Sequence, residues 1–306
     1  MPQKKPYWPR LFFIPLFCLL FIGSTNAQDS LKFRQRKKFI IVANSLAYSS
    51  LMVGLNELWY KDYPRSKFHF FNDNKQWLQM DKVGHLYSCY YEGLVGIEMM
   101  KWAGYTQKEY SLIGGAYGLF IQTGVEILDG FSEEWGASPG DMTANIIGAG
   151  LAISQSYFWD EQRCIIKYSY SPSSFPQYRP NVLGNNIIEQ LLKDYNGQTY
   201  WMSCNIRSFL PETKWPSWLN LAIGYGADGM VGGDDNIFHR DGRTYDYSSF
   251  HRKRQFYISP DIDLSRIQTK NKVIRSLLIV FNSFKFPMPT IEYHSDIGLK
   301  GHWIKF

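Results

Sequence analysis

The sequence predicts a mainly α-helical protein, with an apolar four-helix up-and-down bundle and a C-terminal extension of mixed α and β structure. Four apolar stretches of helix length fill residues 38–160, and small residues recur four apart in the last two of them. After about residue 160 the pattern changes to short alternating segments that are typical of strands. We therefore expect three parts: a signal peptide at 1–27, a helical domain at 38–160 and an extension at 161–306.

Residues 1–27 have the parts of an export signal. A basic segment, MPQKKPYWPR, precedes the apolar run LFFIPLFCLLFIG, and the small residues of STNAQ allow cleavage after Ala27. The run is too short for a comfortable transmembrane span. Cys18 follows Phe17, where a lipoprotein signal needs a small residue, so we do not expect lipidation. The sequence predicts an exported cell-envelope protein, periplasmic or membrane-associated, whose mature chain begins near Gln28.

The four apolar stretches carry few charges and are joined by polar segments. They span residues 39–59, 83–103, 110–128 and 142–158. Small residues lie four apart at Gly114 and Gly118 and at Ala144, Gly148 and Ala152. Such spacing lets helix backbones approach closely, as in membrane helix pairs. The all-round apolarity favours embedding in a membrane, and a tightly packed soluble bundle is the alternative. The basic segment LKFRQRKKF precedes the first helix, against the usual positive-inside bias, so the topology stays open.

The extension combines one short helix with several strands. NNIIEQLLKDY predicts an amphipathic helix, and LNLAIGYGADGM, RQFYISPDIDL and PTIEYHSDIGLKGHWIKF alternate as strands do. A polar, Asp-rich loop is expected at 228–253.

Composition and cysteine count exclude several classes of protein. With 45% hydrophobic residues the chain is too apolar for disorder, and its net charge of +6 comes without a nucleic-acid-binding motif, so we expect no nucleic-acid partner. After cleavage, Cys89, Cys164 and Cys204 remain, without a CxxC motif. This set predicts neither a disulfide framework nor a zinc site. At most one pair could form, and buried free thiols are the preferred interpretation.

Polar residues gather where the helices begin or end. The stretch DKVGHLYSCYYE, for example, places Asp81, His85 and Glu92 along an apolar helix. In an up-and-down bundle, one end collects Asn56, Glu57, Asp81, His85, Glu126, Asp129, Asp141 and Asn145. Polar groups in an apolar bundle are costly unless they meet one another. We therefore expect His85 to lie within side-chain reach of at least two of the acids Asp81, Glu126, Asp129 and Asp141.

Helix capping is the alternative explanation for these acids. Asp81 and Asp141 stand where N-cap residues belong, His85 could be a satisfied core histidine, and Glu126 could pair with Lys82. Capping explains Glu126 and Asp129 poorly, because acids at a helix C-terminus face the unfavourable end of the dipole. The failure of capping to explain Glu126 and Asp129 favours a functional site at this end of the bundle.

The chemistry of such a site stays open. DGFSEEWGASPGD, residues 129–141, suits a lid or a structured turn, and Ser138 does not lie in a GxSxG nucleophile elbow. His85 and the acids could instead bind a divalent metal, although an HExxH motif is absent. The sequence identifies no catalytic residue, metal or cofactor.

DKVGH, EILDGF and GASPGDMTANIIG together resemble the YfiM-type family of predicted periplasmic (lipo)proteins, which is distantly similar to VanZ-like membrane proteins. The resemblance covers roughly residues 40–160 and implies no activity. It implies a shared set of positions: Asp81, Lys82, His85, Glu126, Asp129, Gly130, Ser138, Asp141, Asn145 and Gly148.

Two functions of different class follow, and whether the protein is an enzyme stays open. The first is a non-enzymatic, membrane-associated envelope protein whose polar cluster fixes the bundle geometry or binds a ligand headgroup. The second is an envelope hydrolase or transferase, metal-dependent or not, acting on a lipid or cell-wall substrate. A membrane or envelope lipid is the expected partner, and no protein partner is identified.

Overall fold

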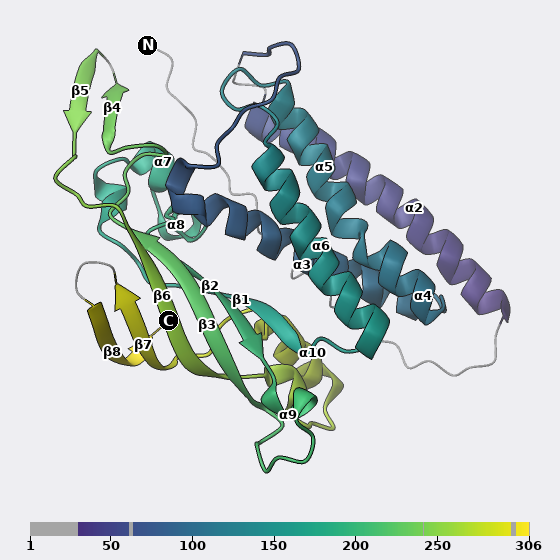
Figure 1. Ribbon diagram of the computed structural model, residues 1–306. Helices are drawn as coiled ribbons and strands as arrows, with labels where there is room; N and C mark the ends of the chain where they lie inside the picture. The colour runs from purple at the N-terminus through teal and green to yellow at the C-terminus, as the bar shows by residue number, and fades with distance from the viewer. Residues whose placement is uncertain (1–29, 61–63, 241, 295–297, 306) are drawn as a thin grey trace. The chain divides into compact units, whose positions relative to one another are not determined.

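The computed structural model describes residues 30–60, 64–240, 242–294 and 298–305. The predicted signal peptide, its cleavage site and Cys18 lie outside the described residues. The chain divides into two compact units (Figure 1). One contains Met1–Asn74 and His85–Gln162, and the other contains Lys75–Gly84 and Arg163–Phe306.

The first unit is helical, because its apolar stretches run for many residues without strand-like alternation. Its helices are α2 (Ser30–Leu55), with the π-helical turn Asn56–Tyr60 at its end, most of α3 (Met80–Trp102), α4 (Gln107–Glu109), the π-helical turn Tyr110–Gly114, α5 (Tyr117–Gly130) and α6 (Pro139–Trp159) (Figure 1). Each predicted apolar stretch thus lies largely within a helix.

Close helix packing explains the spaced small residues. A side chain at Gly148 of α6 would overlap the carbonyl oxygen of Leu86 in α3, and one at Gly118 of α5 would overlap the carbonyl oxygen of Cys89. These glycines therefore let α5 and α6 lie directly against the backbone of α3.

Two helical stretches are long and apolar enough to cross a membrane by length and composition, Lys32–Leu55 and Gln107–Gly130, in the part of the chain that the structure describes. The first is almost wholly exposed, whereas half of the second is buried inside the protein, as a core helix of a water-soluble protein would be. Membrane embedding therefore stays a prediction.

The second unit corrects the predicted fold class. Among the described residues it contains a six-stranded antiparallel sheet in the order β1-β2-β3-β6-β7-β8 and a separate two-stranded β4–β5 hairpin. The strands are β1 (Cys164–Tyr170), β2 (Gln198–Cys204), β3 (Leu219–Asp228), β4 (Ile237–Arg240), β5 (Arg243–Asp246), β6 (Lys253–Ile262), β7 (Met288–His294) and β8 (Gly298–Lys305). A mainly α protein with a small extension is therefore wrong, and the fold is mixed α and β.

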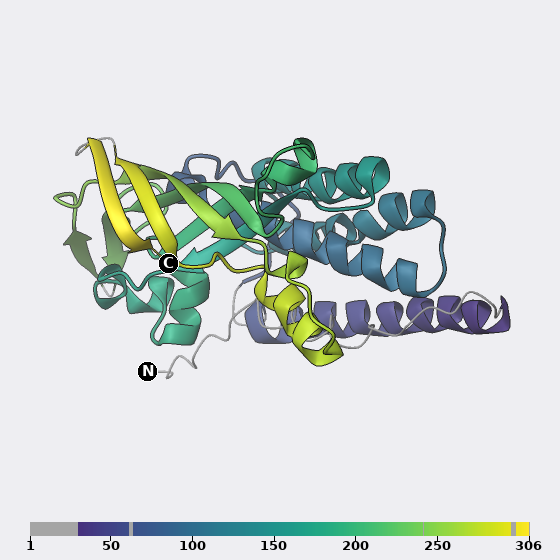
Figure 2. The same cartoon turned by 90° about the horizontal axis from the view of Figure 1, so that it is seen from below.

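Short helices accompany the sheet. They are α7 (Pro180–Leu183), α8 (Ile187–Lys193), α9 (Ile206–Phe209) and α10 (Lys272–Phe281). Figure 2 shows α8 and α10 beside the sheet rather than within it. The hairpin β4–β5 occupies the segment that the sequence predicted to be a loop, and α10 was not predicted.

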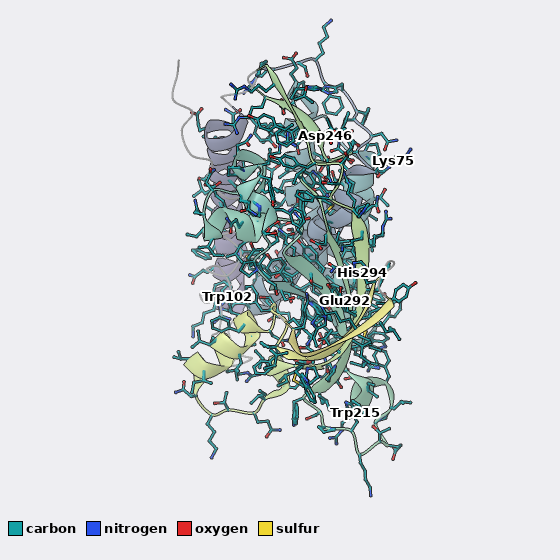
Figure 3. All side chains as sticks on the ribbon, turned by 90° about the vertical axis from the view of Figure 1, so that its left-hand side faces the viewer. Lys75, Trp102, Trp215, Asp246, Glu292 and His294 are labelled. Atoms are coloured by element: carbon teal, nitrogen blue, oxygen red, sulfur yellow. A yellow bond between two sulfur atoms is a disulfide. The ribbon has the colours of Figure 1, made fainter. Side chains whose placement is uncertain are left out.

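The two faces of the sheet differ in polarity. On one face, Ile223, Ile258 and Ile291 are neighbours across β3, β6 and β7, and all three are about half exposed. On the other face, polar residues are buried, among them Glu292 and His294 of β7 (Figure 3). Over this part of the sheet, apolar side chains are exposed on one face, and the other face buries polar side chains together with the aromatic Tyr257.

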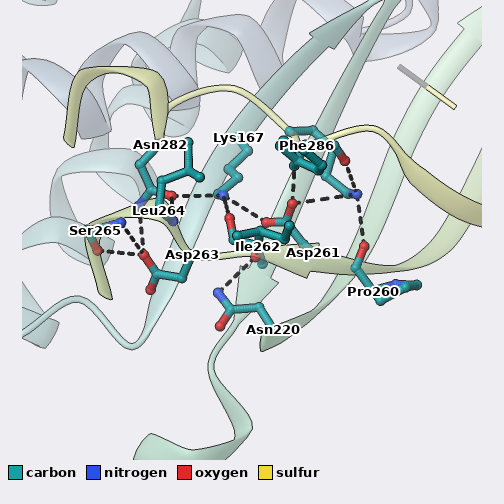
Figure 4. A network of polar contacts seen from close by, with 12 residues as sticks. Lys167, Asn220, Pro260, Asp261, Ile262, Asp263, Leu264, Ser265, Asn282 and Phe286 are labelled. Atoms are coloured by element: carbon teal, nitrogen blue, oxygen red, sulfur yellow. Dashed lines mark hydrogen bonds and ion pairs between the residues drawn. The ribbon is translucent and has the colours of Figure 1, made fainter. Parts of the chain in front are cut away.

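A buried ionic network stabilises the polar face (Figure 4). The fully buried Lys167 Nζ of β1 lies 2.8 Å from Asp261 Oδ2 of β6 and donates to the carbonyl oxygen of Ile262 and to Asn282 Oδ1. Because buried charges are stable only when paired and hydrogen-bonded, these contacts join β1, β6 and the end of α10.

Lys285 is the second cation of the network. Its Nζ lies 3.5 Å from Asp261 Oδ1 and donates to the carbonyl oxygens of Pro260 and Phe286. Burial lowers the pKa of the Lys285 ammonium to about 8, and Asp261 opposes this shift. Asp261 thus compensates two buried lysines at once.

The preferred interpretation of free thiols is wrong for two cysteines. Cys164 and Cys204 are directly opposite one another on β1 and β2 and form a disulfide. Cys89 is a buried free thiol. A disulfide is expected in an oxidising compartment outside the cytosol.

Candidate functional site

Three helices of the first unit bring His85, Glu126 and Asp141 together. His85 lies in the second turn of α3, Glu126 in the last turn of α5 and Asp141 in the first turn of α6. His85 Nδ1 lies 3.9 Å from Glu126 Oε1, and His85 Nε2 lies 3.8 Å from Asp141 Oδ1. The histidine therefore lies between two acids, one at each ring nitrogen, and both distances are too long for a direct hydrogen bond.

Glu126 is held through one oxygen only. Its Oε2 accepts a hydrogen bond of 2.9 Å from the Ser138 N–H, whereas the buried Oε1 has no hydrogen-bond partner among the described residues. Burial raises the pKa of the Glu126 carboxyl to about 7, although His85 and the Ser138 N–H oppose this effect. The carboxylate thus presents an unsatisfied oxygen to His85.

Asn145 lies one turn after Asp141 on α6 and shares its face. Its side chain is fully buried, and neither its amide oxygen nor its amide nitrogen has a hydrogen-bond partner among the described residues. The buried His85 Nδ1 has none either. A buried polar atom without a partner costs about 1–3 kcal/mol, so His85 Nδ1 and Glu126 Oε1, which face one another at 3.9 Å, favour the binding of a further polar group.

Ser138 provides the cap that the sequence analysis attributed to Asp141. Its Oγ accepts from the Asp141 N–H at 3.1 Å and donates to Asp73 Oδ1 at 2.5 Å. Asp141 itself lies in the first turn of α6, where the helix dipole favours an acid. Capping alone therefore does not account for the position of the Asp141 carboxylate near His85.

The other predicted site residues have different partners. Asp81, one turn before His85 on α3, accepts from the Tyr195 hydroxyl at 3.0 Å and pairs with Lys82 at 3.2 Å. Lys82 thus pairs with Asp81. The buried Asp129 carboxylate accepts a hydrogen bond of 2.7 Å from the Tyr60 hydroxyl. The contact with Tyr60 gives Asp129 a structural role.

Sequence reasoning missed two residues of this region. Asp73 holds the Ser138 hydroxyl, and Gln122 donates to both carboxylate oxygens of Glu92 at 2.9 and 3.0 Å. Gln122 could have been found, because it lies one turn before Glu126 on the same face of α5. Asp73 follows no helical pattern and gives no such signal.

Glu92 should make the stability of the helical unit depend on pH. Desolvation raises the pKa of its carboxyl to about 8, so the folded protein keeps a proton that the unfolded chain loses above about pH 4.5. Stability from this group is therefore lost as the pH rises from about 4.5 through 8. Glu126 acts in the same direction. We expect Glu92→Gln to reduce the difference between the unfolding free energies at pH 5 and pH 8 by about 1–2 kcal/mol. This is less than the full pKa shift implies, because the Glu92 side chain is partly exposed.

Urea unfolding followed by helical ellipticity at the two pH values measures this effect. Glu98→Gln is the matched control, because Glu98 lies on the same helix with its side chain 69% exposed. An unchanged pH dependence in Glu92→Gln would contradict the assignment.

Comparison with known proteins supports the predicted location. Residues 69–156, which include His85, Glu126 and Asp141, match a family described as predicted periplasmic lipoprotein (DUF2279). Comparisons with curated proteins and with solved structures give no match. The prediction of an exported cell-envelope protein is thus confirmed, and over residues 69–156 the chain is similar to a family of predicted periplasmic lipoproteins.

Proposed function

We propose that this exported envelope protein binds a divalent cation in its helical unit, with His85 Nε2 and Asp141 as ligands. The observation that carries the proposal is the position of His85 between two buried carboxylates, 3.9 Å from Glu126 Oε1 and 3.8 Å from Asp141 Oδ1, with neither His85 Nδ1 nor Glu126 Oε1 hydrogen-bonded among the described residues.

The spacing of the ligand atoms fits a cation better than a direct contact. Nitrogen and oxygen ligands lie about 2.0–2.2 Å from a zinc-sized ion, so two ligands of one ion are at most about 4.4 Å apart. The 3.8 Å between His85 Nε2 and Asp141 Oδ1 lies within this limit. Asn145 lies one turn further along α6 and is fully buried on the same face as Asp141.

Glu126 has the position of a group that orients the histidine. A histidine ligand usually donates its other ring N–H to a carboxylate, which fixes the ring and raises its basicity. His85 Nδ1 faces Glu126 Oε1, and Ser138 holds the opposite oxygen of that carboxylate. A closing movement of about 1 Å would complete the hydrogen bond. Glu126 is thus a positioning residue.

The donor set favours a transition-metal ion. Imidazole suits Zn²⁺ and similar ions, whereas Mg²⁺ and Ca²⁺ prefer oxygen alone. We expect Zn²⁺ or Mn²⁺ to bind more tightly than Mg²⁺.

The relation to known families and the association with lipid are part of the same proposal. We infer a distant relation of residues 40–160 to YfiM-type and VanZ-like proteins, and association of the protein with a membrane or envelope lipid. Ser138 uses its hydroxyl to cap α6 and to bind Asp73, which argues against Ser138 as a catalytic nucleophile.

Cation binding is tested by thermal unfolding of the purified full chain with and without Zn²⁺, together with elemental analysis. At a free concentration 100 times the dissociation constant, the ion should stabilise the protein by about 2.7 kcal/mol. We expect Asp141→Asn to remove this stabilisation and Glu126→Gln to weaken binding by about 10–100-fold.

Asp160→Asn is the matched control, because Asp160 caps the other end of α6 and pairs with Lys101. This variant should keep the response to the ion. If wild type and Asp141→Asn respond equally to every ion, the acids have only a structural role. Asp141→Asn would then cost about 1 kcal/mol, as the loss of a favourable first-turn charge does.

A further inference from the structure

Helix α10 of the second unit has its polarity reversed. Its apolar residues Val273, Ile274, Leu277 and Phe281 are 67%, 47%, 42% and 54% exposed, whereas Ser276 is 8% exposed. Asn282, at its end, is buried and accepts from Lys167. An amphipathic helix of a soluble protein normally turns its apolar side inward. The outer side of α10 is therefore suited to an apolar environment.

Positive charge adjoins this apolar side. An open pocket of about 510 Å³ at the N-terminal end of α10 is lined by Ser265, Arg266, Ile267, Gln268, Thr269, Lys270 and Arg275. Asp263 and Ser208 hold Arg266 in the pocket wall. Lys270 and Arg275 are exposed, and no carboxylate among the described residues pairs with them. α10 itself contains no acidic residue.

We propose that α10 docks on an anionic lipid bilayer. Lys270, Arg275 and the hydroxyl groups of the pocket bind a lipid phosphate group, and Val273, Ile274, Leu277 and Phe281 enter the acyl-chain boundary. This surface is separate in sequence from the proposed cation site and does not depend on it.

Charge and polarity together identify a lipid as the occupant. An apolar side flanked by unpaired basic residues on a helix with a polar inner side is the pattern of helices that lie in the membrane interface. Each basic residue near an anionic surface strengthens binding by several-fold. A protein that bound the exposed apolar side of α10 would not require the unpaired positive charges of Lys270 and Arg275 beside a pocket.

An environment-sensitive fluorophore on α10 tests the proposal. Leu277→Cys is labelled in the chain that begins at Gln28, where Cys89 is buried and Cys164 is bonded to Cys204. With vesicles containing phosphatidylglycerol we expect a blue shift, and with phosphatidylcholine alone we expect little shift. Replacing both Lys270 and Arg275 by Gln should raise the half-saturating lipid concentration by about 10-fold or more. Inorganic phosphate should leave the fluorophore unchanged.

Two further label positions serve as controls. Arg243→Cys lies on the exposed hairpin strand β5, and Ile223→Cys lies on the exposed apolar face of the sheet. Neither should shift. A shift at position 223 without one at 277 would show that the sheet, and not α10, contacts the bilayer. No shift at position 277, or an equal shift with uncharged vesicles, would overturn the proposal, as would a response to inorganic phosphate alone.

Discussion

Replacing Asp261 by Asn is expected to lower the free energy of unfolding of the second unit by about 3–5 kcal/mol. The substitution leaves the ammonium groups of Lys167 and Lys285 buried without a negative charge between them (Figure 4). An unpaired buried charge is far more costly than the loss of the pair. Lys167→Met should cost less, because Lys285 still compensates Asp261.

Urea unfolding followed by tryptophan fluorescence measures both variants, since Trp201 lies beside Lys285. The matched control is Asp228→Asn on β3 of the same sheet, where the Asp228 side chain is 31% exposed and lies 4.0 Å from Lys253. Such exposed pairs contribute at most about 1 kcal/mol. If Asp261→Asn is as mild as Asp228→Asn, the network does not stabilise the sheet.

Replacing Gly148 by Ala is expected to destabilise the helical unit by about 1–3 kcal/mol or more. The new methyl group would overlap the carbonyl oxygen of Leu86, which belongs to the backbone of α3 and cannot rotate away. Because α3 carries His85 and α6 carries Asp141, any separation of these helices should also weaken cation binding.

Gly150 of the same helix provides the comparison. A side chain at this position would meet nothing within 4 Å, so Gly150→Ala should stabilise α6 by about 0.5–1 kcal/mol through its helix propensity. Thermal unfolding followed by helical ellipticity distinguishes the two variants. Equal effects of both substitutions would contradict the close approach of α3 and α6.

The strands differ in how far the sequence could predict them. β3 and β6 alternate between exposed and buried residues, as the sequence pattern indicated. β1 is buried over five successive residues and β2 over its first four, so neither shows alternation. Local periodicity cannot recognise such strands, and the sheet was therefore underestimated in the predicted fold class.

The candidate site was predictable to a similar extent. Helical spacing and the costs of burying polar groups were enough to place His85 near acids of other helices, and the structure brings it to Glu126 and Asp141. Spacing could not predict that Tyr60 binds Asp129 or that Ser138 rather than Asp141 caps α6. Both contacts depend on where the connecting segments run.

The sequence by itself determined the export signal, the helices of residues 30–159 and the polar residues at their ends, because each follows from local composition and helical periodicity. Only the tertiary structure decided the pairing of β1 with β2, the disulfide between Cys164 and Cys204, the network around Asp261 and the outward apolar side of α10. These features depend on strand register and on contacts between residues far apart in the chain, and no local pattern in the sequence specifies such contacts.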